Sequence, residues 1–121
     1  MARFRYIVHD VDQAIVFYER LGFTVEMHPG PGFAMLRRDD LQLALNVPGG
    51  GGGAGQAMPD GTLPEPGGWS RIMLEVDDVA AEVDRLAGAT FRSGVIEGRG
   101  VRQVIVEDPS GNAVELFTPL G

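Results

Sequence analysis

The hydrophobic pattern of the chain alternates between a period of two residues and a helical period. Apolar and polar residues alternate over residues 3–9, which predicts a half-buried strand. Asp10 then precedes a run in which apolar residues recur every three or four positions, and Gly22 follows that run, so we expect a helix between them. Alternation returns in short stretches separated by turn residues, which predicts strands over residues 23–28, 33–37 and 41–47.

The same order of elements repeats in the second half of the chain. A helix capped by Asp77 or Asp78 follows the first of four strand patterns, which cover residues 69–76, 90–95, 101–107 and 113–118. Arg3 recurs 68 positions later as Arg71, and Asp10 recurs at the same offset as Asp78. The expected fold class is therefore α+β, built as a tandem βαβββ repeat.

The two predicted halves, about residues 1–48 and 68–121, belong to one expected domain of 1–121. Glycine and proline dominate the connecting segment, residues 49–67, in which Gly49 to Gly53 are consecutive. Such composition is typical of a flexible linker, but long connections in compact domains also serve as lids. Both interpretations stay open.

Composition excludes several classes of function. There are 10 Lys and Arg residues against 17 Asp and Glu residues, a net charge of −7, so nucleic acid is not an expected partner. With no cysteine, thiolate metal sites and disulfides are excluded. No apolar run approaches the ~20 residues needed to span a bilayer, and the N-terminal residues lack the apolar stretch of a secretory signal, so we expect no membrane association and a cytoplasmic location.

Two motifs carry a resemblance to a known family. The run from Asp10 to Tyr18 and the run from Glu107 to Leu116 resemble the opening helix and the closing hairpin of the vicinal oxygen chelate superfamily, which includes glyoxalase and bleomycin-resistance proteins and dioxygenases. The resemblance implies two cupped mixed sheets around a cleft. It also implies a homodimer.

Enzymes of that superfamily hold a divalent metal at four positions, which correspond here to Arg3, Gln42, Arg71 and Glu115. Only Glu115 is a competent ligand, because a guanidinium is charged and has no lone pair to offer. Two arginines would also repel a cation. We therefore expect no metal at this position and no cofactor.

Strand parity places these four side chains opposite the apolar residues beneath the helices, so the resemblance implies that they point into the cleft. One interpretation is that Glu115 pairs with Arg71 or Arg3 and braces the halves in place of a metal. The other is that one arginine stays available to bind an anionic or carbonyl-bearing molecule.

The function implied by the resemblance is metal-independent binding of a small organic molecule, with sequestration of a toxic natural product as one form. The predicted ligand-binding residues are Arg3, Arg5, Gln42, Asn46, Trp69, Arg71, Met73, Glu115 and Phe117. Trp69 has two open interpretations, a stacking surface for the ligand or an anchor for the linker. We expect His9, His28, Arg92 and Arg102 to be surface residues.

The alternative is an enzyme (a lyase, isomerase or dioxygenase) in which Glu115 is the general base and an arginine such as Arg71 stabilises an oxyanion. A metal site that the sequence does not reveal is a second form of this alternative. A module without a ligand is a third possibility.

Overall fold

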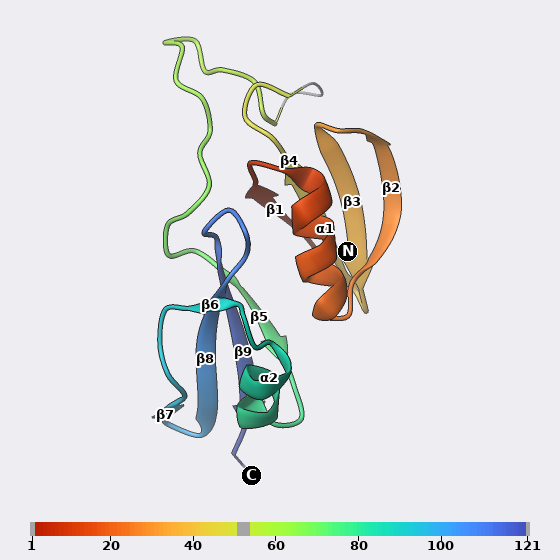
Figure 1. The fold of residues 1–121 in the computed structure, drawn as a ribbon. Coiled ribbons are helices and arrows are strands. Elements are labelled where there is room, and N and C mark those ends of the chain that lie inside the picture. Colours follow the sequence, from red (N-terminus) through yellow and green to blue (C-terminus); the bar gives the residue numbers. More distant parts are fainter. Residues whose placement is uncertain (1, 51–53, 121) are drawn as a thin grey trace. The chain divides into compact units, whose positions relative to one another are not determined.

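The computed structural model describes residues 2–50 and 54–120, and the chain forms two compact units, residues 1–67 and 68–121. Each unit pairs one helix with one mixed sheet, so the predicted α+β class and the repeat are confirmed (Figure 1). The elements of the first unit are β1 (Ala2–Ile7), α1 (Val11–Arg20), β2 (Thr24–Gly30), β3 (Phe33–Arg38) and β4 (Leu41–Asn46).

The first sheet has the order β1-β4-β3-β2, with β1 parallel to β4 and the other neighbours antiparallel. Helix α1 covers one face of this sheet (Figure 1). On that face Tyr18 is fully buried and stacks on Tyr6 of β1. Leu36 and Leu43 are buried on the same face, as the alternating pattern requires. We call the face of each sheet opposite its helix the reverse face.

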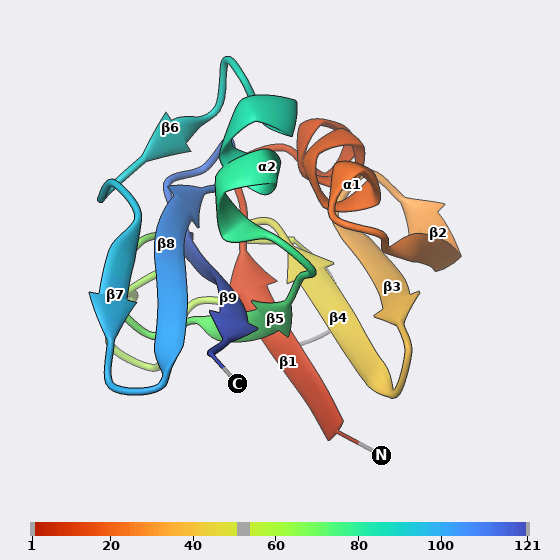
Figure 2. The same ribbon diagram turned by 90° about the horizontal axis from the view of Figure 1, so that it is seen from below.

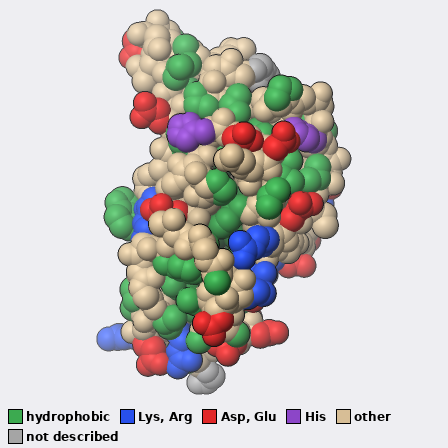
Figure 3. Space-filling model, in the orientation of Figure 1, with side chains coloured by type: hydrophobic (Ala, Val, Ile, Leu, Met, Phe, Trp, Pro, Cys, Tyr) green, Lys and Arg blue, Asp and Glu red, His purple; other side chains and the backbone are tan. Residues whose placement is uncertain are grey.

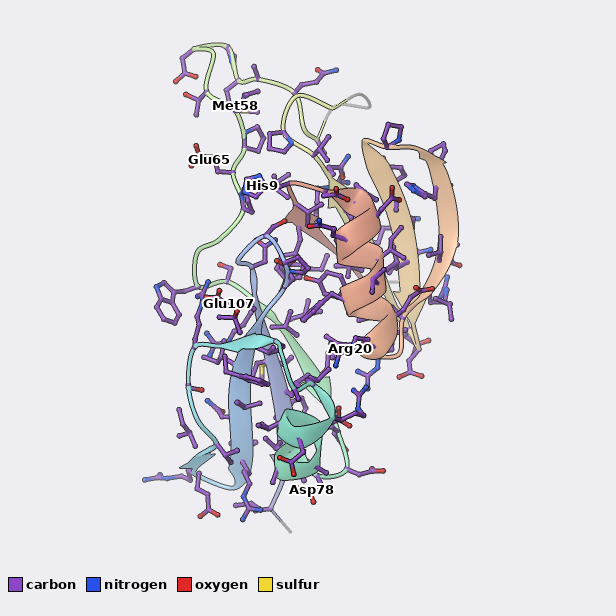
Figure 4. The ribbon with its side chains drawn as sticks, viewed as in Figure 1. His9, Arg20, Met58, Glu65, Asp78 and Glu107 are labelled. Carbon is purple, nitrogen blue, oxygen red and sulfur yellow. The ribbon has the colours of Figure 1, made fainter. Side chains whose placement is uncertain are left out.

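Both helices begin at an aspartate, as the sequence predicts. The Asp10 side chain accepts a hydrogen bond from the amide of Gln13, and that of Asp78 accepts from the amides of Ala80 and Ala81. Asp78, rather than Asp77, is therefore the cap of α2 (Figure 4). The offset of 68 residues between the two caps confirms the register of the repeat at the helices.

The second unit contains one strand more than predicted. Its elements are β5 (Ile72–Glu75), α2 (Val79–Arg85), β6 (Thr90–Phe91), β7 (Ile96–Gly98), β8 (Val101–Glu107) and β9 (Ala113–Pro119). The order is β5-β9-β8-β6, and β7 also pairs with β8 (Figure 2). The continuous strand expected over residues 90–95 is wrong, because the chain bends at Ser93 and Gly94 and then pairs again further along β8.

The strand expected over residues 69–76 begins later, at Ile72, which leaves Trp69 and Arg71 outside β5. The pairing also differs between the units. Arg3 is the Cα partner of Gln42, whereas the partner of Glu115 is Met73, two residues beyond Arg71. The strand pairing of the second unit is thus shifted by two residues relative to that of the first. Because side chains alternate between the faces with a period of two, this shift leaves each side chain on the same face of its sheet.

The described residues of the segment between β4 and β5 form backbone hydrogen bonds with one another. Gly49 donates its amide to the carbonyl of Gly55, and a turn is closed by a hydrogen bond from Met58 to Thr62. Gly51 to Gly53, part of the predicted linker or lid, lie outside the described residues. Among residues 2–50 and 54–120, no helix is long and apolar enough to cross a membrane.

Candidate ligand-binding site

Arg3 and Arg5 extend from the reverse face of β1, and amide side chains of β4 hold both of them. Arg3 Nε donates to Gln42 Oε1 at 2.6 Å, and Arg5 Nη1 donates to Asn46 Oδ1 at 2.6 Å. Within the described part of the chain, neither guanidinium forms a salt bridge, although Glu26 attracts Arg3 electrostatically, so both keep further N–H groups for other acceptors. Two oriented, charged donors on one strand can bind an anion.

The orientation of Gln42 is set by a carboxylate on the edge strand. Gln42 Nε2 donates to Glu26 Oε1 at 2.9 Å, which leaves the amide oxygen facing Arg3. Arg37 Nε donates to the other oxygen, Glu26 Oε2, at 3.0 Å. These bonds, first that of Gln42 and then that of Arg37, lower the pKa of Glu26. The network crosses all four strands of the first sheet.

Glu26 marks a register shift between β2 and β3. Val25 is paired with Leu36 on the helix side, but Met27 is paired with Met35 on the reverse face. The extra residue is a β-bulge, which changes the side to which the following residues point. His28 consequently faces α1, where Nε2 lies 3.0 Å from Asp12 Oδ1 and Nδ1 lies 2.9 Å from the carbonyl of Phe33.

In the second unit, Arg71 and Glu115 form a salt bridge. Arg71 Nε and Nη2 lie 3.0 and 2.9 Å from the same oxygen, Glu115 Oε1. The Glu115 side chain is 4% exposed and that of Arg71 is 26% exposed. The predicted pairing of Glu115 with an arginine is therefore formed by Arg71, but both residues belong to the second unit, so this salt bridge does not brace one half against the other as expected. Arg71 Nη1 also donates to the carbonyl of Trp69 at 3.2 Å.

Arg92, expected to be a surface charge, instead joins several parts of the second unit, and this expectation was wrong. Its Nε donates to Glu107 Oε2 at 2.8 Å, and its two other nitrogens donate to the carbonyls of Gly68 and Gly111. Glu107 lies at the end of β8 (Figure 4). The guanidinium carbon lies 4.6 Å from the ring centre of Trp69, a cation–π contact.

The other predicted site residues, Trp69, Met73 and Phe117, all lie in the second unit. Trp69 is 69% exposed although one ring face lies against Arg92, which supports the anchor interpretation without removing the ring from solvent. Met73 is exposed beside Glu115, and Phe117 is half-buried on the same reverse face. Arg102 pairs with Glu97 at the surface, as expected.

Sequence reasoning missed the contribution of Glu26 and the pairing of His28. A bulge is not visible in a pattern of period two, and the pairing of His28 depends on it, whereas the contacts of Glu26 depend on which strands lie side by side. The sequence signal available was only that glutamate and histidine occupy the first predicted strand after the helix.

The residues at the four family metal positions do not fit a divalent cation. Arg3 and Arg71 present N–H groups, and the carboxylate of Glu115 already accepts a hydrogen bond from Arg71 Nε and forms a salt bridge with Arg71 Nη2. No group of three or more histidine, cysteine, aspartate or glutamate side chains among the described residues is arranged to hold a metal. The β-bulge at Glu26 adds to this lack of metal ligands, because it turns the imidazole of His28 away from the reverse face.

This chain is similar in sequence and in structure to several known proteins. A curated protein of Mycolicibacterium smegmatis, uncharacterized, is 29% identical over 111 residues, which are 92% of this chain and 86% of that protein. The crystal structure of TnmS3, an antibiotic binding protein from Streptomyces sp. CB03234, is 27% identical with a TM-score of 0.71, covering 98% of this chain and 94% of that one.

The lactoylglutathione lyase from Agrobacterium tumefaciens has a TM-score of 0.73 over 98% of this chain and 92% of that one, and at 19% identity it shows the fold alone. The sequence profile of the Glyoxalase/Bleomycin resistance protein/Dioxygenase superfamily matches residues 1–116. The two βαβββ units and this match together show that the chain belongs to the Glyoxalase/Bleomycin resistance protein/Dioxygenase superfamily.

Proposed function

We propose that this chain binds a small organic anion directly through side chains, with Arg3 and Arg5 as the charged donors and without a metal ion. The observation that carries the proposal is that each guanidinium is held by one neutral amide, from Gln42 or Asn46. An amide orients the guanidinium without cancelling its charge. The remaining N–H groups are therefore positioned before the ligand arrives.

Local charge supports an anionic ligand. The reverse face of the first sheet carries Arg3, Arg5 and Arg37 against Glu26, or 3 − 1 = +2, in a chain whose net charge is −7. Acidic side chains are spread over the face of the molecule in Figure 3. A positive region on an acidic protein attracts anions selectively to that region.

The second unit, taken by itself, carries a separate group of proposed ligand-binding residues, namely Trp69, Arg71, Met73, Glu115 and Phe117. Met73 and the exposed ring of Trp69 offer apolar contact surface. Sequestration of a toxic natural product is one form of this function, and the similarity to an antibiotic binding protein supports it. A homodimer and a cytoplasmic location are further expectations, which rest on the family and the composition.

The test is calorimetric titration of the whole chain with benzoate and with its neutral analogue benzamide. We expect benzoate alone to bind, and Arg3→Gln or Arg5→Gln to weaken it about tenfold, because each removes a charge-assisted hydrogen bond. Arg102→Gln is the control, since it removes the same charge from a residue paired with Glu97. Binding should survive treatment with a chelator.

Equal binding of benzamide, or a loss of binding that tracks metal removal, would overturn the proposal.

An enzymatic role has one supporting observation. The hydrogen bond from Arg71 Nε and the salt-bridge contact of Arg71 Nη2 both involve Glu115 Oε1, and no described residue donates to Oε2. If Oε2 is a general base, Glu115→Gln should abolish turnover of a bound compound while leaving its affinity within about threefold.

A further inference from the structure

On the reverse face of the first sheet, the side chains of Cα partners on neighbouring strands form rows, and two of these rows differ in chemistry. Arg3, Gln42 and Arg37 are Cα partners across three strands and form a polar row. The next row starts at Arg5 on β1 and continues through Ala44, Met35 and Met27 on the other three strands. A charged group and two thioethers therefore lie at opposite ends of one row.

The β-bulge at Glu26 determines what occupies the far end of this row. Without the register shift, the pairing that starts at Thr24 and Arg37 would place Glu26 opposite Met35 and would turn Met27 to the helix side. With it, Met27 lies opposite Met35, and His28 bonds to Asp12 of α1. The bulge thus places an apolar side chain, rather than a carboxylate, at the end of the row that starts at Arg5.

Met27 is 54% exposed on an edge strand, and Met35 beside it is partly exposed. Ala44, the residue between Arg5 and Met35 in this row, contributes only a buried methyl group. Arg5 and Met35 are separated by two strand spacings, about 10 Å. Thioethers are polarizable and adapt their shape, and they make favourable contacts with aromatic rings.

From this arrangement, and resting on the proposed function, we infer that the ligand is an aryl carboxylate or similar aryl anion of bicyclic size. Its anionic group meets Arg5 and Arg3, and its ring system lies on Met35 and Met27. An inorganic anion leaves the thioethers unused, and a neutral aromatic compound leaves the guanidinium groups unused. The row is matched by a molecule that has both parts.

The experiment compares benzoate with 2-naphthoate by calorimetric titration of the full chain. We expect 2-naphthoate to bind about tenfold more tightly, because the second ring buries additional apolar area. Met27→Ser should reduce 2-naphthoate affinity about threefold and leave benzoate affinity unchanged, since only the larger ring reaches β2. Met27→Leu should restore the preference. Arg5→Gln should weaken both compounds by the same factor.

Met58→Ser is the matched control, because Met58 is 48% exposed on the connection after β4 (Figure 4) and has no place in the row. It should leave both affinities unchanged. Equal affinities for the two compounds, or a preference that Met27→Ser does not alter, would overturn the inference while leaving the proposed function standing. Failure of the wild-type chain to bind either carboxylate would overturn the proposed function itself.

Discussion

Arg71 directs two nitrogens, Nε and Nη2, to one oxygen of Glu115, at 3.0 and 2.9 Å. The two partners are unequally buried, because Glu115 is almost fully enclosed and Arg71 retains access to solvent. Removing Arg71 therefore lowers the free energy of unfolding by a different amount from removing Glu115. A carboxylate left alone in the interior is more expensive than an arginine that still has water and the Trp69 carbonyl to bond.

We expect Arg71→Met to lower the free energy of unfolding by about 2–4 kcal/mol and Glu115→Gln to lower it by less. Combining Arg71→Met with Glu115→Leu should recover much of the loss, because no buried charge then remains. Urea denaturation followed by circular dichroism measures all three variants. Equal losses for the two single variants would contradict the asymmetry.

The pairing of His28 with the Phe33 carbonyl and Asp12 raises the pKa of this histidine above its usual 6.5. The folded chain then holds the proton more tightly than the unfolded chain does. The resulting stabilisation is complete below the unfolded pKa and is lost as the pH rises through the folded pKa. The urea midpoint of the wild type should accordingly fall towards that of His28→Gln as the pH is raised from about 6 to above the folded pKa.

Asp12→Asn should retain part of this pH dependence, since the carbonyl of Phe33 contributes more to the raised pKa than Asp12 does. His9 is present in every variant and cancels in the comparison. Parallel curves for the wild type and His28→Gln would show that the histidine is not coupled to folding.

Arg92 forms three hydrogen bonds with separate acceptors and one ring contact, and lysine cannot reproduce that planar arrangement. Arg92→Lys should lower the free energy of unfolding by about 2 kcal/mol. Trp69 is the single tryptophan of the chain, so its fluorescence anisotropy reports the loss of the ring contact directly. We expect the anisotropy to fall.

Arg102→Lys serves as the comparison, because Arg102 is more exposed and pairs only with Glu97 in the described structure. Its effect should remain within about 0.5 kcal/mol. An unchanged anisotropy in Arg92→Lys would mean that the guanidinium does not hold the ring.

Gly55 lies where a side chain cannot be accommodated. A Cβ atom there would be 2.2 Å from the carbonyl oxygen of Val47 and 3.2 Å from the amide of Gly50. Gly55→Ala should therefore displace the start of the connection after β4 and cost about 1–3 kcal/mol of stability. Gly30→Ala is the control, because nothing lies within 4 Å of a Cβ at Gly30. Equal stability of the two variants would show that residues around Gly55 are not held against β4.

Most of the fold could be predicted because its signals are local. Periodicity identified both helices, aspartate caps located their first turns, and the offset between Asp10 and Asp78 related the halves. Parity alone placed Arg3 and Gln42 on one face, which their hydrogen bond confirms. The strand expected over residues 90–95 failed because its division depends on two separate pairings with β8.

The sequence by itself determined which residue types are present at the family metal positions, and therefore that guanidinium groups occupy two of them. It also determined the βαβββ repeat, since alternation and capping depend on neighbours in the chain. Only the tertiary structure decided the partners: Arg71 rather than Arg3 for Glu115 within the described contacts, Glu26 for Gln42, and Met27 rather than Glu26 opposite Met35. These depend on a bulge and on strand register, which arise when distant segments pair and are not encoded in any local pattern.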